Sequence, residues 1–261
     1  LYNCKNSGAL PTSENGVAQI MNLTDHQQLY MTITGEMTTE QMIAEINKVS
    51  GDKKAVTFAG TLSDAGTLTL PADCESFTSV TQTFSNVSLT NYNVAVALNI
   101  PGEYTLTGLG EGKTVTIGGT NVNVIVPDTE CNGGSIKLSG DNITLSNSGT
   151  LNHVTFTGEA NSTYTLNNNG TITYTTDAGN QHTVDSVGAA RNITIHNRGR
   201  IESKSNGGTG SYAMLFYNGC TVAIHDYPDS VISAGERSAT YKFISNDSTV
   251  SYYLHIAGEP N

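Results

Sequence analysis

Short stretches in which apolar residues alternate with Thr or Ser recur along the whole chain. Each has the form apolar–polar–apolar, which is typical of a strand with one buried face, and Asn or Gly interrupts it after three residues. The triplets recur about every 28 to 31 residues, apart from one shorter interval of about 21. The eight triplets are residues 56–58, 87–89, 115–117, 143–145, 164–166, 193–195, 222–224 and 252–254.

A turn-type residue recurs two positions after most of these triplets. Asn and Gly tolerate left-handed backbone angles, and Asn side chains can also stack, each amide bonding to the next along a cross-β axis. These features predict a parallel β-solenoid with about 28 residues in most coils. The recurring residues are Asn91, Gly119, Asn147, Asn168, Asn197 and Asp226.

A three-residue strand is stable only in such a stack, where it pairs with the equivalent strand of the next coil about 4.8 Å away. Inward side chains then form a continuous apolar column, and we expect Leu89, Ile117 and Leu145 to lie along one interior line. The crossover rule favours right-handed winding.

One segment has the pattern of an amphipathic helix. Thr38 and Gln41 read as a capping box, and Met42, Ile43 and Ile46 begin an apolar stripe. The predicted organisation is an N-terminal extended segment (1–37), a capping helix (38–50) and an all-β, single-stranded right-handed parallel β-helix of about seven to eight coils (51–258).

The coil period, asparagine turns and capping helix resemble those of right-handed parallel β-helix proteins, the pectin-lyase-like superfamily, over roughly residues 38 to 258. The loosely repeating Thr/Asn/Gly coils also look like those of exported, adhesin-like surface proteins of gut-type bacteria. The resemblance implies carbohydrate handling in a groove along one face. A leucine-rich-repeat solenoid is the alternative, but its L-x-x-L-x-L pattern is missing.

Charge narrows the classes of partner. The 261-residue chain carries a formal net charge of −11, with 12 Lys and Arg residues, and this disfavours phosphate backbones and anionic membranes. We expect no nucleic-acid partner and no cofactor. No apolar run approaches the ~18 residues of a membrane-spanning helix. The Asn/Thr/Ser-rich composition predicts an extracellular or outer cell-surface location in bacteria.

The four cysteines, Cys4, Cys74, Cys131 and Cys220, form no C-x-x-C signature. Buried thiols are the favoured interpretation, and one or two disulfides are the alternative. The sequence LYNC weakly resembles the end of a lipoprotein signal, which would place a lipid anchor at Cys4, although Asn3 is larger than the usual preceding residue.

The predicted strand phase also defines outward columns. One column is rich in Thr, which suggests an ice-binding face. Such a face needs a second, matching Thr column, but the neighbouring column is mixed in composition. Thr is also common on the exterior of any strand. In that neighbouring column His196, His225 and His255 fall on successive coils. Such a stack is a weak candidate for Zn²⁺ or Cu²⁺, and a solvated surface feature is the favoured interpretation.

The segment 191–204 holds most of the only basic cluster of the chain and is the best candidate for a ligand-facing patch. Nearby Tyr rings suit stacking on sugars. The carboxylates of the C-terminal half do not pair in the manner of a glycosidase, so no catalytic residue is predicted. The candidate ligand-binding residues are Arg191, Arg198, Arg200, Lys204, Tyr212, Tyr217, Asp226 and Tyr227.

Three hypotheses follow for function. The favoured one is a non-enzymatic secreted or cell-surface β-helix that binds a glycan or a host or matrix protein. The second is a polysaccharide lyase or glycoside hydrolase acting in a groove near residues 177–237. The third is a structural stalk component without a small ligand.

Overall fold

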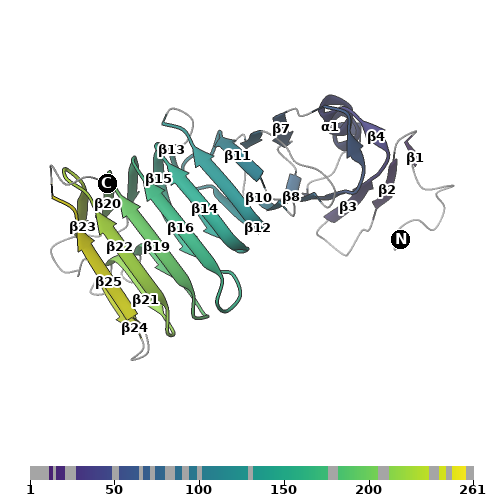
Figure 1. Ribbon diagram of the computed structural model, residues 1–261. Coiled ribbons are helices and arrows are strands. Elements are labelled where there is room, and N and C mark those ends of the chain that lie inside the picture. The colour runs from purple at the N-terminus through teal and green to yellow at the C-terminus, as the bar shows by residue number, and fades with distance from the viewer. Residues whose placement is uncertain are drawn as a thin grey trace.

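The structure is a computed structural model. It describes residues 12–13, 16–20, 28–48, 53–64, 67–70, 74–79, 86–89, 94–98, 102–128, 132–175, 182–204, 212–234, 241–244 and 249–256. Among these residues the chain forms 25 strands and one helix. The strands stack as a parallel β-solenoid, with α1 (Thr39–Lys48) near one end and β25 (Thr249–Leu254) near the other (Figure 1).

Two long parallel sheets face each other across the interior, and we name them sheet A and sheet B. The two antiparallel strands β1 (Thr12–Ser13) and β2 (Gly16–Ile20) extend sheet A at its N-terminal edge. The parallel strands of sheet A are β3 (Gln28–Ile33), β5 (Lys53–Phe58), β8 (Cys74–Ser79), β10 (Val94–Leu98), the first half of β12 (Thr114–Val126), β13 (Asn132–Leu138), the second half of β15 (Thr150–Phe156), β18 (His182–Ser186), β21 (Tyr212–Tyr217) and β24 (Tyr241–Ile244).

Sheet B carries the outer face on which the candidate site lies. Figure 1 shows its later strands side by side along the molecule. Its strands are β7 (Thr67–Leu70), β9 (Asn86–Leu89), β11 (Gly102–Thr107), the second half of β12, β14 (Asp141–Asn147), β16 (Thr163–Asn168), β19 (Asn192–Asn197), β22 (Thr221–Asp226) and β25.

Short strands complete the coils. The first half of β15 pairs with β17 (Thr171–Tyr174), which is followed by β20 (Arg200–Ser203) and β23 (Val231–Ala234). Near the N-terminal end, β4 (Glu36–Met37) pairs with β6 (Thr61–Leu62). From β11 to β25, seven sheet B strands are joined by six windings, so the regular part makes about six turns. This differs slightly from the predicted seven to eight coils.

The coils have two lengths, and the shorter length is not confined to the one short interval that the sequence indicates, because Val122, Ile143 and Tyr164 are successive register partners 21 residues apart. Asn147 and Asn168 are register partners in sheet B and lie 21 residues apart in the chain. Asn168 and its next partner, Asn197, lie 29 residues apart. In the short coil a single strand, β15, pairs with both β17 and β18, whereas in the longer coil these are two separate strands with additional residues between them.

The predicted column of Leu89, Ile117 and Leu145 is therefore wrong. Ile117 pairs with Val96 and Leu138 in sheet A, whereas Leu89 and Leu145 belong to sheet B. The triplets of both sheets share the apolar–polar–apolar form, so the period alone cannot assign a triplet to a sheet. The later part of the predicted series is correct, and it stacks Leu145, Leu166, Ile195 and Ile224.

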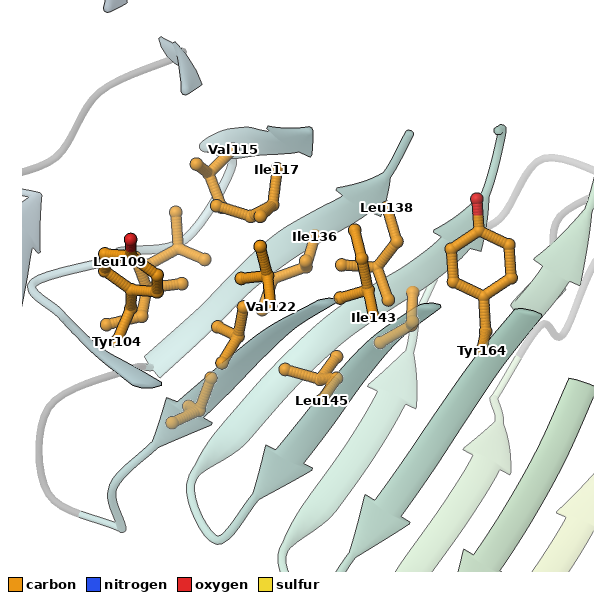
Figure 2. Packing of buried hydrophobic residues seen from close by; sticks show 14 of the residues in the cluster. Tyr104, Leu109, Val115, Ile117, Val122, Ile136, Leu138, Ile143, Leu145 and Tyr164 are labelled. Atoms are coloured by element: carbon orange, nitrogen blue, oxygen red, sulfur yellow. The ribbon is translucent and has the colours of Figure 1, made fainter. Parts of the chain in front are cut away.

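The interior is a continuous apolar core between the two sheets. Ile117 and Leu138 of sheet A and Ile143 and Leu145 of sheet B point into it and are at most 1% exposed (Figure 2). Burying one such side chain contributes about 1.5–3 kcal/mol. The stacking of coils thus stabilises strands that are individually too short.

Helix α1 takes the place that a sheet B strand occupies in later turns, and it contacts β7, the first described strand of that sheet. Met42 and Ile46 are fully buried. The predicted capping box is confirmed, because Thr38 N–H donates to Gln41 Oε1 (2.8 Å) and Gln41 N–H to Thr38 Oγ1 (3.1 Å). Lys54 Nζ, which is buried, donates to the carbonyl of Ile46 near the C-terminal end of the helix (3.0 Å).

The recurring asparagines form a buried hydrogen-bonded ladder. Asn147 Nδ2 donates to Asn168 Oδ1 (2.9 Å), and Asn168 Nδ2 donates to Asn197 Oδ1 (2.8 Å). Asn197 Nδ2 donates to Asp226 Oδ1 (3.1 Å), so the ladder ends on a carboxylate. The predicted stacking is confirmed. Of the recurring turn residues that the structure describes, Gly119 has a positive φ, whereas Asn147, Asn168, Asn197 and Asp226 do not; the described non-glycine residues with left-handed angles are Asn121, Asn142, Asn161, Asn218 and Asp229.

Gly170 follows the ladder at a close contact between successive coils. A Cβ atom there would lie 2.2 Å from the carbonyl oxygen of Gly149 in the preceding coil. Gly199 repeats this approach one coil later, where a Cβ atom would lie 2.0 Å from the carbonyl oxygen of Gly170. The repeated Asn-x-Gly sequence therefore places an amide in the interior and a residue without a side chain at the following contact.

Candidate functional site

The outer face of sheet B in its last four strands is polar and lacks acidic side chains, and the exposed Asp141 lies at the start of β14, the strand before them. In each strand, outward residues alternate with buried ones, as in Asn192, Thr194 and His196 of β19. No outward position within 142–148, 163–169, 192–198, 221–227 or 249–255 is Asp or Glu. In a chain of net charge −11, this face is a surface of hydroxyl, amide and ring groups.

Five rings gather at the C-terminal end of this face, and we name them the ring cluster: His196, His225, Tyr227, Tyr253 and His255. His196 stacks on His225 with ring centroids 4.6 Å apart, and His225 stacks on Tyr253 at the same distance. Tyr227 and His255 form a second, nearly parallel pair at 4.3 Å. The parallel register places equivalent side chains one above another, so the rings stack along the solenoid axis.

Polar contacts link the two stacks. His225 Nδ1 lies 3.2 Å from His255 Nε2, and His196 Nδ1 lies 3.1 Å from the Tyr227 hydroxyl oxygen. The Arg198 guanidinium lies over the Tyr227 ring, with its central carbon 3.7 Å from the centroid. Arg198 and His255 thus both contact Tyr227, and a cation–π contact of this kind contributes about 0.5–1 kcal/mol at an exposed site.

The environment keeps two of the imidazoles uncharged at neutral pH. Burial lowers the pKa of His196 below its ordinary value, and the neighbouring His225, Arg198 and His255 lower it further. Burial also lowers the pKa of His225, with a further contribution from His255. Both rings therefore present one N–H donor and one lone pair.

The predicted histidine stack is present with a shift at its end. His196 and His225 are paired in register, but the residue opposite His225 in β25 is Tyr253. The reason is that β25 pairs with β22 two residues earlier than the sequence period indicates. His255 lies opposite the next outward position and reaches His225 diagonally. Among the described residues, no group of three or more His, Cys, Asp or Glu side chains is arranged to hold a metal ion.

Two of the predicted ligand-binding residues lie in the interior. Arg191 is 3% exposed, and its guanidinium donates to the carbonyls of Gly158, Val187 and Ala189 and to Ser186 Oγ. Asp226 is 9% exposed and accepts from Asn197, Ser230 and Tyr252. Both residues serve the packing of successive coils.

The other predicted residues divide among three places in the fold. Arg198 and Tyr227 belong to the sheet B face. Arg200 and Lys204 lie at β20, where each is 3.4 Å from Glu202 Oε2. Tyr212 stacks on His182 on sheet A, and the half-buried Tyr217 lies at the end of β21. The predicted basic cluster is therefore not one patch.

A second group of titratable side chains lies at β15 and β18. His153 Nε2 is 3.2 Å from Asp185 Oδ1 and 3.0 Å from Thr155 Oγ1. Asp185 is 7% exposed, and its contact with His153 lacks hydrogen-bond geometry. Part of the predicted groove lies outside the described residues, namely 176–181, 205–211 and 235–240. Asp177, Glu236 and Arg237 belong to this part.

The structure describes two of the four cysteines, Cys74 and Cys220. Cys220 is a buried free thiol whose Sγ lies 3.0 Å from the carbonyl oxygen of Tyr217. Cys74 is also buried, with its Sγ 3.3 Å from the carbonyl of Ser76. Cys131 lies outside the described residues, and so does Cys4, the site of the predicted lipid anchor. No helix of the described part of the chain is long and apolar enough to cross a membrane.

Comparison with family models, with curated proteins and with solved structures finds no match to this chain. The likeness to parallel β-helix proteins is therefore one of architecture, carried by the stacked coils themselves. The function has to be inferred from the site.

Proposed function

We propose that this chain is a non-enzymatic, secreted or cell-surface protein of a bacterium, and that it recognises a glycan through the outer face of sheet B. The observation that carries the proposal is the ring cluster at the end of a face without acidic groups. Sugars are recognised by hydroxyl, amide and imidazole hydrogen-bonding groups together with an aromatic ring face.

Tyr253 is the residue best placed to stack on a sugar. One face of its ring is covered by His225, at 4.6 Å. Its strand, β25, is the last described strand of sheet B, and Tyr253 is 48% exposed. Covering the second face with a pyranose ring would bury about 60 Å² of apolar surface, which contributes about 1.5 kcal/mol.

Hydrogen-bonding groups lie beside that ring face. Ser251 and Thr249 of the same strand point to the same side, as does His225 of the neighbouring strand. Adjacent strands are about 4.8 Å apart, so these groups form a regular array over several strands. Such an array favours an extended oligosaccharide over a single sugar.

The test is a glycan array on the whole chain, followed by calorimetry with the glycan that binds best. We expect Tyr253→Ala to weaken binding about tenfold, because tenfold corresponds to about 1.4 kcal/mol. Tyr30→Ala is the matched control, since Tyr30 is 40% exposed but lies on β3 of the other sheet. An array without signal, or equal affinity of Tyr253→Ala and the parent chain, would contradict the proposal.

A second candidate is a polysaccharide lyase or glycoside hydrolase, and the His153–Asp185 pair is the observation that favours it. A carboxylate 3.2 Å from an imidazole would hold that ring for proton transfer once substrate binding aligns the contact as a hydrogen bond. A reducing-sugar release assay on the glycans of the array separates the two candidates. Turnover that is lost in His153→Ala supports the enzyme, and binding without any release supports the binding protein.

A further inference from the structure

The contact between His225 and His255 has the geometry of a two-imidazole metal site. Their facing nitrogens, Nδ1 of His225 and Nε2 of His255, are 3.2 Å apart. Transition metals bind imidazole nitrogen at about 2.0–2.1 Å. A metal ion bound to both nitrogens at this distance would have an N–metal–N angle of about 100°, close to the tetrahedral value that zinc prefers.

The position of the two rings in the fold supports metal entry. Both histidines are half-buried on the outer face of sheet B, so one side of the pair is open to solvent. His255 is held by the Tyr227 ring at 4.3 Å and His225 by the rings of His196 and Tyr253, each at 4.6 Å. The stacking fixes both ring planes, so little conformational freedom would be lost on binding.

We propose that His225 and His255 together bind a divalent transition metal ion, Zn²⁺ or Cu²⁺, with water completing the coordination. Imidazole suits both metals, and the net charge of −11 favours cations in the surroundings of the protein. The metal site uses ring nitrogens of the two histidines, whereas the proposed stacking of a sugar uses the open face of Tyr253; His225 lies beside both.

Arg198 opposes the metal ion. Its guanidinium lies on Tyr227, the same ring on which His255 stacks. A positive charge in the neighbourhood of the site raises the free energy of a bound cation. Replacing Arg198 with a neutral residue should therefore tighten metal binding, an effect that a merely structural role of the two histidines would not produce.

The test is a titration of the whole chain with zinc chloride in a calorimeter. We expect one equivalent to bind and either His225→Ala or His255→Ala to weaken the affinity at least tenfold. His182→Ala is the control, because His182 lies on sheet A and stacks on Tyr212, and it should leave the affinity unchanged. Arg198→Gln should tighten it about threefold.

Copper provides a second readout that reports the ligands themselves. Electron paramagnetic resonance of the chain with one equivalent of Cu²⁺ should show hyperfine coupling to two imidazole nitrogens, and to one in either alanine variant. Absence of zinc binding by the parent chain, or unchanged affinity in either variant, would show that the 3.2 Å contact is only a hydrogen bond between the two imidazoles and would overturn the proposal.

Discussion

At the scale of single residues, the interior contains polar groups whose hydrogen bonds run from coil to coil. Asn168 is fully buried and bonds to Asn147 in the preceding coil and to Asn197 in the following one. Its Nδ2 also lies 3.2 Å from the carbonyl oxygen of Arg200. Buried amides are costly unless every group is paired, and the ladder satisfies this condition by repetition.

Asn168→Ala should lower the free energy of unfolding by about 2–4 kcal/mol, because it leaves the amides of Asn147 and Asn197 without one partner each. Chemical denaturation measures the change. Asn169→Ala is the matched control, since the neighbouring Asn169 is exposed and its loss should cost less than about 0.5 kcal/mol. Equal effects of the two substitutions would show that the ladder contributes no stability.

The ladder could be predicted from the sequence, whereas the role of Arg191 could not. Asn147, Asn168 and Asn197 recur at the same place after each strand, so their stacking follows from the repeat. Arg191 occurs once and lies beside other basic residues in sequence. Only the fold brings its guanidinium to the carbonyl of Gly158, 33 residues away.

At the scale of elements, α1 is joined to the next coil at its first turn. Asp64, which follows β6, accepts from the backbone N–H (2.8 Å) and the Oγ1 (2.7 Å) of Thr39. These bonds lower the pKa of the Asp64 carboxyl below its ordinary value, the side-chain bond first. The carboxylate also interacts favourably with the N-terminal end of the helix dipole.

A lowered pKa in the folded state means that ionised Asp64 stabilises the fold above the pKa of the unfolded chain, about 3.9. This stability is lost as the pH falls through the folded pKa. Asp64→Ala should therefore be less stable than the parent chain at pH 6, and the difference should shrink at pH 3. Denaturation of both proteins at the two pH values measures it, and a difference independent of pH would contradict this role.

Local signals and long-range register differ in how well the sequence reveals them. The helix was predictable because Thr38, Gln41 and the apolar stripe lie within one segment. The assignment of Ile117 was not, since its triplet has the same form as that of Leu145 on the opposite sheet. The two-residue shift of β25, which places Tyr253 in the ring cluster, has no local signal at all.

At the scale of the whole molecule, the account depends on coils of two lengths that stack in register. The short coil between β14 and β16 and the longer coil between β16 and β19 both bring the buried asparagines of sheet B into register. The neutral outer face and the ring cluster result from the same register, because it places residues distant in sequence side by side.

Cross-linking of paired cysteines tests this register most directly. Thr144 and Thr165 are neighbours on the outer face of sheet B, whereas Thr116 and Thr144, which a single sequence period would pair, belong to opposite sheets. Each pair would be changed to cysteine in a chain whose four native cysteines are replaced by alanine, and treated with dibromobimane, which fluoresces when it bridges two adjacent thiols. We expect a bridge in Thr144→Cys/Thr165→Cys and none in Thr116→Cys/Thr144→Cys; the reverse result would contradict the stacking described for this protein.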